Sequence, residues 1–377
     1  MRPFLLIALP IPGVLAWGNL GHQTIAHLAS TLIHPSTTHW AQTILNDTSE
    51  AYLATISTWA DTYRRTAEGA FSAPFHYIDA NDDPPRSCGV DFERDCLGEG
   101  CVVSAIANYT RRVMAADVLD AKEVDYALRW IVHFVGDITQ PLHDEAVEIG
   151  GNGINVTFSG RKTNLHASWD TAIPEQLRGG YTLADAKAWA ENLTAELAPR
   201  GKFGRVKDNW VKGMNVQDPK ETAMIWARDG NSFVCDTVIP NGVEGVRGDE
   251  LFPEYYEGVV DVVEMQIAKG GYRLAKWLDG IAESVEGKKG RKGVKKDGPG
   301  PKAPGKGKGL GPKRSVEESV EESVKEEWDL SGRDLLPEGS VVGGLLSPAQ
   351  RRREAVLGSG DCGQSGQYEM SLMSCHQ

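Results

Sequence analysis

The segment WIVHFVGDITQPLHDE, residues 130–145, combines a helical hydrophobic pattern with side chains that bind metals. His133 and Asp137 are four residues apart, so they share one face of a helix. The residue before a proline avoids the helical conformation, so this helix ends before Pro141 and His143 follows on a turn. The segment therefore predicts a helix that carries His133 and Asp137 on one face near its end, with His143 on the turn that follows.

Three other segments repeat apolar residues at three- and four-residue intervals, which is typical of amphipathic helices. They are TIAHLASTLI (24–33), TLADAKAWAENLTAEL (182–197) and VVDVVEMQIAKGGYRLAKWL (259–278). The best strand signal is INVTF (154–158), which follows a GGNG turn and predicts part of a short hairpin. We therefore expect an all-α fold with long loops and at most one short β-hairpin.

The chain changes character twice along its length. Residues 1–16 carry Arg2, an apolar run and a small-residue end, which predict a secretory signal cleaved after Ala16. The apolar run is too short and too interrupted by prolines for a membrane span. Residues 17–285 have the composition of one globular domain. Residues 286–377 are rich in Gly, Pro, Lys and Ser, which predicts a disordered tail.

Other features fit a secreted, extracellular glycoprotein. Four Asn-x-Thr sequons predict N-glycosylation, at Asn46, Asn108, Asn155 and Asn192. The cysteines suit an oxidising compartment; they are Cys88, Cys96, Cys101 and Cys235 in the body and Cys362 and Cys375 in the tail. Sequence alone does not fix their pairing. Cys96 and Cys101 are close enough to close a small loop, which would leave Cys88 to pair with Cys235.

The net charge of −12 is unevenly distributed. Residues 1–287 contain 24 Lys and Arg and 39 Asp and Glu, so their charge is 24 − 39 = −15. A body that binds nucleic acid through its own basic surface would not have this charge. Either nucleic acid is not the substrate, or something other than Lys and Arg supplies the positive charge. The basic run in the tail fits a solvated segment, or a tether to nucleic acid or cell wall.

Three further segments pair candidate ligands with nearby charged residues, and one of them repeats the four-residue spacing of the first segment. NLHASWD places His166 four residues before Asp170, STWADTYRR places Asp61 three before Arg64, and PFHYIDA places His76 three before Asp79. A single His-x3-Asp pair is more typical of a surface pair than of a metal site. Two such pairs, one followed by His143, favour a metal site. The remaining residues His27, His34, His39 and His376 have no carboxylate at useful spacing.

Imidazole and carboxylate ligands in an exported protein suit zinc. There are too many of these ligands for one tetrahedral ion, so we expect two or three zinc ions, each with room for water. Such a cluster is suited to the hydrolysis of phosphate esters, because zinc activates bound water and neutralises charge on the attacking and leaving oxygens.

The ordered set of motifs from Trp17 to about residue 280 resembles the fungal single-strand-specific three-zinc nucleases (the S1/P1 type), which also have plant members. The resemblance rests on W-x4-H at the predicted mature start, W-A-D, F-H-Y-I-D, H-x3-D-x2-Q-P-L-H, G-G-N-G-x-N and N-L-H-x3-D. It implies the mainly helical fold that this family shares with zinc-dependent phospholipase C. The tail from about residue 286 is not part of the family's usual body.

The resemblance implies three zinc ions with nine ligands. Asp61, His76, His133 and Asp137 would hold one ion. The free amine and carbonyl of Trp17, with His22 and Asp137, would hold the second, so that Asp137 bridges the two inner ions. His143, His166 and Asp170 would hold the third, more exposed ion. The resemblance also implies the disulfides Cys88–Cys235 and Cys96–Cys101.

The implied reaction is hydrolysis of single-stranded DNA and RNA, with 3′-nucleotides as further substrates and 5′-phosphate products. Zinc-held hydroxide would attack phosphorus in line, with Asp61 and Asp137 among the catalytic ligands. Arg64 would contact the phosphate or transition state, where a guanidinium can bond with two oxygens. Asp79 would hydrogen-bond the base, Asn152 would position the substrate, and Tyr77 would stack on the base. The resemblance further implies a monomer without membrane association.

Two other functions stay open. The first is a zinc-dependent phospholipase C, which shares a similar fold and zinc cluster. The phospholipase pattern typically has glutamate at the last ligand position, where this chain has Asp170. This chain also carries the F-H-Y-I-D base-site motif, which phospholipases lack. A catalytically silent secreted glycoprotein, stabilised by zinc, is the second alternative. The complete set of implied ligands and Arg64 favour the nuclease.

Overall fold

The computed structural model describes residues 17–293, with side chains up to residue 287. The predicted signal, residues 1–16, and residues 294–377 of the predicted tail lie outside this range, as do Cys362, Cys375 and His376. No helix within residues 17–293 combines the length and apolar character that crossing a bilayer needs.

The described chain is mainly helical, as the periodicity predicts. Its α-helices are α1 (Asn19–Leu32), α2 (Pro35–Leu45), α3 (Tyr52–Ile56), α4 (Trp59–Tyr63), α5 (Phe92–Asp95), α6 (Val102–Met114), α7 (Ala121–Asp137), α8 (Leu165–Ala167), α9 (Ile173–Arg178), α10 (Leu183–Glu196), α11 (Pro219–Phe233) and α12 (Glu254–Gly293). Short 3-10 turns cover Ala70–His76, Pro141–Asp144, Lys207–Val211 and Val243–Gly245, and π turns cover Ser168–Ala172 and Val234–Val238.

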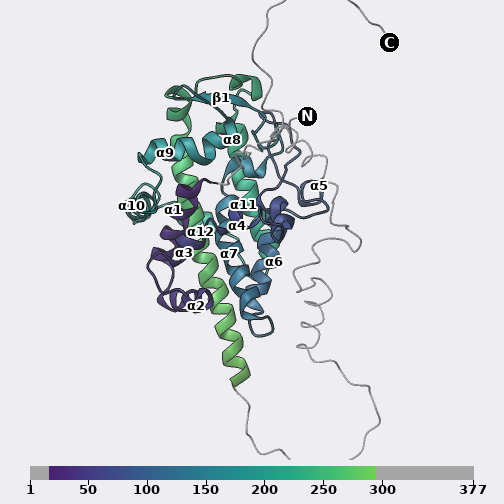
Figure 1. Ribbon diagram of the computed structural model, residues 1–377, viewed down its shortest axis with the longest axis vertical. Helices are drawn as coiled ribbons and strands as arrows, with labels where there is room; N and C mark the ends of the chain where they lie inside the picture. The colour runs from purple at the N-terminus through teal and green to yellow at the C-terminus, as the bar shows by residue number, and fades with distance from the viewer. Residues whose placement is uncertain (1–16, 294–377) are drawn as a thin grey trace, which may run out of the picture.

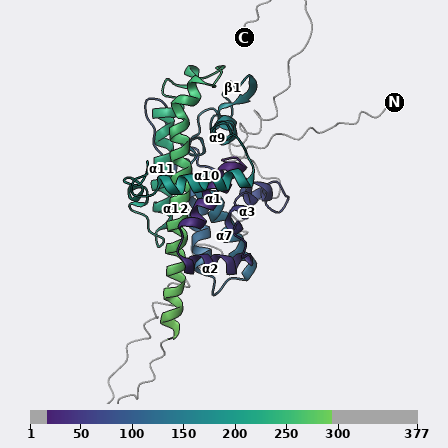
Figure 2. The ribbon, with the colours of Figure 1, turned by 90° about the vertical axis from the view of Figure 1, so that its left-hand side faces the viewer.

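Helix α12 forms the spine of the molecule (Figure 1). It packs against α1, α7 and α6, and α10 lies across α1 (Figure 2). The core along these interfaces contains six fully buried tryptophans, Trp17, Trp130, Trp169, Trp189, Trp226 and Trp277. Large, rigid side chains of this kind bury much apolar area at little entropic cost, so they fix the positions of the helices that carry the polar site.

The last helix runs slightly past residue 285, the predicted end of the globular domain. Helix α12 continues to Gly293, into the segment 286–377 that we expect to be disordered. Adding a residue to an existing helix needs no new nucleation, and Lys and Arg are good helix formers. The last core side chain of this helix is Val285, so the hydrophobic contacts do end where the composition changes.

The predicted hairpin is present as β1 (Asn155–Phe158) and β2 (Arg161–Asn164), paired antiparallel with Asn155 opposite Asn164. The turn between them uses Ser159 and Gly160 with positive φ, as two-residue hairpins require. Figure 1 shows the hairpin at one end of the helical body. It delivers the chain directly to α8, which carries His166.

Both disulfides predicted for the body are confirmed. Cys88 pairs with Cys235 and Cys96 with Cys101. The first joins the loop after the F-H-Y-I-D segment to the π turn after α11. The second closes a small loop immediately before α6. The first therefore ties the segment 77–101 to the end of α11, and the second constrains that segment just before α6.

Candidate metal centre

The end of α7 forms the centre of the site, as residues 130–145 predict. His133 and Asp137 lie fully buried on one face, with His133 Nε2 3.2 Å from Asp137 Oδ2. His133 Nδ1 donates to the carbonyl oxygen of Ser57 at 2.7 Å, which leaves Nε2 to face the site. Gly136 allows α1 to approach closely, because a Cβ there would lie 2.7 Å from Nδ1 of His22.

Helix α4 and the following 3-10 turn complete an inner group of four side chains. His76 Nδ1 lies 3.0 Å from Asp137 Oδ2 and 3.0 Å from His133 Nε2. Asp61 Oδ1 lies 3.8 Å from His76 Nδ1 and 3.9 Å from His133 Nε2. These four residues are the set predicted for one ion, and the ligand atoms of His76, His133 and Asp137 lie within 4.8 Å of one another.

The start of the described chain forms the second group. His22 Nε2 lies 3.2 Å from Asp137 Oδ1, so the two oxygens of Asp137 face different groups. Trp17 is fully buried and its Nε1 donates to Thr139 Oγ1 at 3.1 Å. The N–H of Gly18 donates to the carbonyl oxygen of Asp170 at 2.7 Å. The chain start is therefore fixed between α7 and the third group.

The third group lies on the other side of this chain start. His166 Nε2 is 3.1 Å from Asp170 Oδ2, and His143 Nε2 is 3.9 Å from Asp170 Oδ1. Each imidazole is oriented by a backbone carbonyl, since Nδ1 of His143 donates to His76 O at 2.6 Å and Nδ1 of His166 to Gly150 O at 2.5 Å. A hydrogen bond from the ring nitrogen that faces away from the metal typically orients a metal-binding histidine.

Four buried ligand atoms lie 3.1–3.3 Å from an ionisable neighbour but make no hydrogen bond of good geometry: Nε2 of His22, Nε2 of His166, Oδ1 of Asp61 and Oδ1 of Asp137. Each buried polar atom left unsatisfied costs about 1–3 kcal/mol. Their concentration in one place, and the mixture of imidazole and carboxylate, fits bound cations that complete the contacts.

The pKa shifts of His22, His76 and Asp137 favour the forms that bind cations, whereas that of His133 does not. Burial lowers the pKa of His22, and burial with the nearby Arg64 guanidinium lowers the pKa of His76 to about 4. Burial would raise the pKa of Asp137. The nearby His133 and the hydrogen bonds that Asp137 makes with histidines instead hold the pKa of Asp137 well below the usual range. Burial would lower the pKa of His133, but the nearby Asp137 and Asp61 outweigh the effect of burial and raise the pKa of His133. Neutral imidazole and ionised carboxylate are the metal-binding forms.

The predicted substrate residues lie beside this centre. Arg64 Nη2 is 3.3 Å from Asp61 Oδ1, and the arginine side chain is 14% exposed. Tyr77 and Asp79 are half-buried on either side of buried Ile78, so this extended segment turns both toward one side. Ile78 N donates to the carbonyl oxygen of His143 at 2.8 Å, which places the segment against the third group.

Asn152 is 6% exposed and follows an unusual turn. Its Nδ2 donates to the carbonyl oxygen of Ile149 at 2.9 Å. Residues Glu148, Ile149, Gly150 and Gly151 all have positive φ, of 46°, 62°, 59° and 78°. A β-branched residue in this region is a strong outlier, and such strain tends to occur at functional sites. Here the turn presents the carbonyl of Gly150 to His166.

Replacing Ile149 with Asn is expected to stabilise the protein by about 1 kcal/mol, because Asn tolerates the left-handed conformation and Ile does not. Urea unfolding of both proteins measures the difference in their free energies of unfolding, provided that the two free energies fall with urea concentration at the same slope. A loss of stability would mean that apolar contacts of Ile149 outweigh the backbone strain.

The four predicted glycosylation sites differ in exposure. Asn46, Asn155 and Asn192 are exposed, whereas Asn108 lies in α6 and is 5% exposed. Glycosylation of all four stays a prediction.

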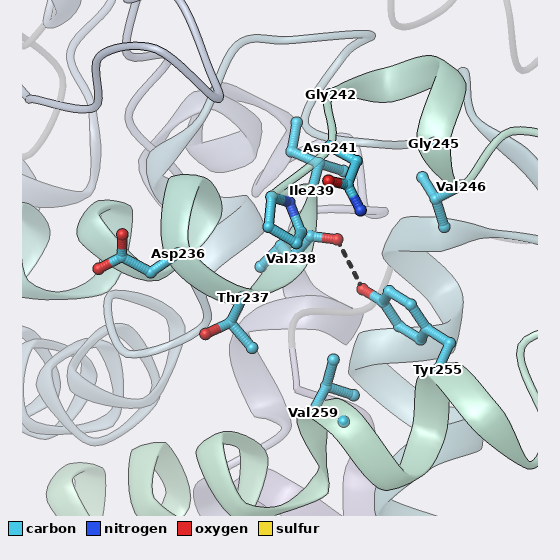
Figure 3. Close-up of a pocket in the computed structure, with 12 residues that line it drawn as sticks. Asp236, Thr237, Val238, Ile239, Asn241, Gly242, Gly245, Val246, Tyr255 and Val259 are labelled. Atoms are coloured by element: carbon cyan, nitrogen blue, oxygen red, sulfur yellow. Dashed lines mark hydrogen bonds between the residues drawn. The ribbon is translucent and has the colours of Figure 1, made fainter.

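A cavity of about 250 Å³ lies elsewhere, between the π turn Val234–Val238 and the start of α12 (Figure 3). Its lining includes Tyr255, whose hydroxyl donates to Val238 O at 2.9 Å and accepts from Trp169 Nε1 at 2.8 Å. The lining contains none of the predicted ligands. The cavity is therefore separate from the metal centre.

Three residues that hydrogen-bond the predicted ligands have no role predicted from the sequence. Ser57, Thr139 and Gln140 are fully buried and contact His133, Trp17 and Asp170. Gln140 belongs to the Q-P-L-H motif, which was the available signal. Ser57 contacts His133 through its carbonyl oxygen, so the identity of the Ser57 side chain gives no signal of this contact.

The known proteins most similar to this chain in the comparisons are nucleases. The family model for S1/P1 nuclease matches residues 17–283. Over 265 residues the chain is 49% identical to nuclease PA3 of a Penicillium species and to nuclease P1 of Penicillium citrinum, covering 70% of this chain and 97% of each relative. It is 50% identical over 266 residues to nuclease S1 of Aspergillus oryzae, covering 71% and 92%. This chain belongs to the S1/P1 nuclease family.

Proposed function

We propose that this protein is a secreted zinc-dependent endonuclease that cleaves single-stranded DNA and RNA to 5′-phosphate products and also acts on 3′-nucleotides. The observation that carries this proposal is the convergence of three groups of histidines and aspartates on one buried centre, His22–Asp61–His133, His76–His133–Asp137 and His143–His166–Asp170, in a member of a nuclease family.

Three zinc ions would be held by the nine predicted ligands. The two inner ions would share Asp137, whose oxygens face His22 on one side and His76 and His133 on the other. The third would lie at His143, His166 and Asp170. Zinc at these positions would activate water and neutralise phosphate charge, which the acidic body cannot do with its own side chains.

The remaining side chains would bind the substrate. Arg64 lies beside Asp61 and its guanidinium suits a phosphate oxygen pair. Tyr77 would stack on a base and Asp79 would accept hydrogen bonds from its edge. Stacking on an aromatic side chain requires an exposed base face, which a duplex hides, and it is tolerant of sequence. Single-strand preference would follow from this requirement.

Secretion is part of the proposal. It is supported by the predicted signal, by both disulfides of the body, and by the exposure of Asn46, Asn155 and Asn192. Disulfides of this kind persist in oxidising compartments.

The test compares three substrates with the zinc-loaded protein: single-stranded DNA, the same sequence as a duplex, and phosphatidylcholine vesicles. We expect rapid cleavage of the single strand, slow cleavage of the duplex and none of the lipid. Lipid cleavage with intact DNA would instead favour a phospholipase C, and no hydrolysis at all would favour a zinc-stabilised glycoprotein.

A further inference from the structure

Gln140 lies inside the metal centre without being one of its predicted ligands. It is fully buried. Its Nε2 donates to Asp170 Oδ1 at 2.6 Å, and its Oε1 accepts from the backbone N–H of Leu142 at 2.6 Å. Because an amide has a donor end and an acceptor end, these two contacts together fix the orientation of the side chain.

The backbone of the same residue joins the other groups of the centre. The N–H of Gln140 donates to the carbonyl oxygen of Asp137 at 2.9 Å, and its carbonyl accepts from the N–H of His143 at 2.9 Å. Helix α7 ends at Asp137, and the 3-10 turn that carries His143 begins at Pro141. Gln140 therefore links one ligand shared by the inner groups to two ligands of the third group.

The residue type is informative at this position. Gln140 caps the N-terminus of the turn Pro141–Asp144, a position where the short side chains Ser, Thr, Asp and Asn are preferred. Capping alone does not need a longer side chain. The extra methylene group allows the other end of the amide to reach Asp170, which lies thirty residues later in the π turn Ser168–Ala172.

The geometry points to Gln140 as a positioning residue that orients Asp170 toward the third metal position. With Oδ1 held by the amide, Oδ2 of Asp170 lies 3.1 Å from Nε2 of His166. Loss of an outer-shell hydrogen bond of this kind typically weakens metal binding 10–100-fold. The inference rests on the proposed function, since it takes His143, His166 and Asp170 as metal ligands.

The variant Gln140→Glu tests the contact. It keeps the size of the side chain and an acceptor for the N–H of Leu142, but an ionised carboxylate cannot donate to Asp170. We expect about 10–100-fold weaker binding of one zinc ion of three. The measurement is zinc retained per chain after dialysis against a graded series of chelator-buffered zinc. Gln140→Met, of similar size and without an amide, is the second variant and should lose the same ion.

Gln266→Glu is the matched control. Gln266 is also fully buried, and its Nε2 donates at 2.7 Å to the carbonyl oxygen of Thr139, the neighbour of Gln140, but to no predicted ligand. This control should keep all three ions at unchanged affinity. The inference is wrong if Gln140→Glu keeps its zinc, or if Gln266→Glu loses the same ion equally. Failure of the proposed function looks different, because the unsubstituted protein would then bind no zinc at this site or leave single-stranded DNA intact.

Discussion

Replacing Asp137 with Asn is expected to remove both inner zinc ions and to lower nuclease activity by at least about 1,000-fold. Asp137 is fully buried, with Oδ1 3.2 Å from His22 Nε2 and Oδ2 3.0 Å from His76 Nδ1. The amide has nearly the same shape but carries no charge and cannot bridge two cations. Metal ions contribute several kcal/mol to such reactions, and each 1.36 kcal/mol is tenfold in rate.

Asp144→Asn is the matched control for this prediction. Asp144 is also fully buried near the centre, but it is not a predicted ligand. Burial and the nearby Asp229 raise the pKa of Asp144 well above its usual range, so a neutral amide resembles its native state. Asp137→Asn places an Asn two residues before Thr139, which creates a glycosylation sequon. Both variants should therefore be made in a bacterial periplasm. Three ions and full activity in Asp137→Asn would exclude the bridging role.

Adding residues before Trp17 is expected to remove the second inner ion and to lower activity by about 100-fold or more. The role of Trp17 as a ligand depends on a free amine, which only cleavage after Ala16 would create. Trp17 is fully buried, and Gly18 is held to Asp170 O at 2.7 Å, so the chain start cannot move aside to admit a longer chain without losing these contacts. Loss of a ligand should exceed the 10–100-fold cost of losing an outer-shell partner.

The control for this prediction uses the same molecule. A protein with a short N-terminal extension is assayed before and after removal of the extension by a protease that leaves Trp17 first. Zinc content and cleavage of single-stranded DNA should both rise on removal. Equal zinc content and activity before and after would mean that the amine of Trp17 is not a ligand.

Much of this centre could be predicted from spacing on single elements. His133 and Asp137 lie four apart on α7, and His166 and Asp170 keep the same spacing across α8 and the π turn, so helical periodicity is enough to pair them. Asp61 and His76 have no such partner nearby in sequence. Their place in the inner group follows from the packing of α4 and the loop against α7, and only the family resemblance anticipated it.

The supporting contacts could not be predicted. Gln140 reaches Asp170 through a side chain whose partner is distant in sequence, and His133 is oriented by the carbonyl of Ser57, which any residue would provide. The positive φ of Ile149 opposes its intrinsic preference and is imposed by the surrounding structure. The end of α12 at Gly293 has no signal in the hydrophobic pattern, because its last turns follow from helix propagation rather than from burial.

We propose that this chain holds three zinc ions through ligands that include its own mature N-terminus. The most direct test is the zinc content of the purified protein, measured on material whose first residue is shown by N-terminal sequencing to be Trp17. We predict three zinc ions per chain. Two or fewer ions on such material, with excess zinc supplied, would contradict the assignment.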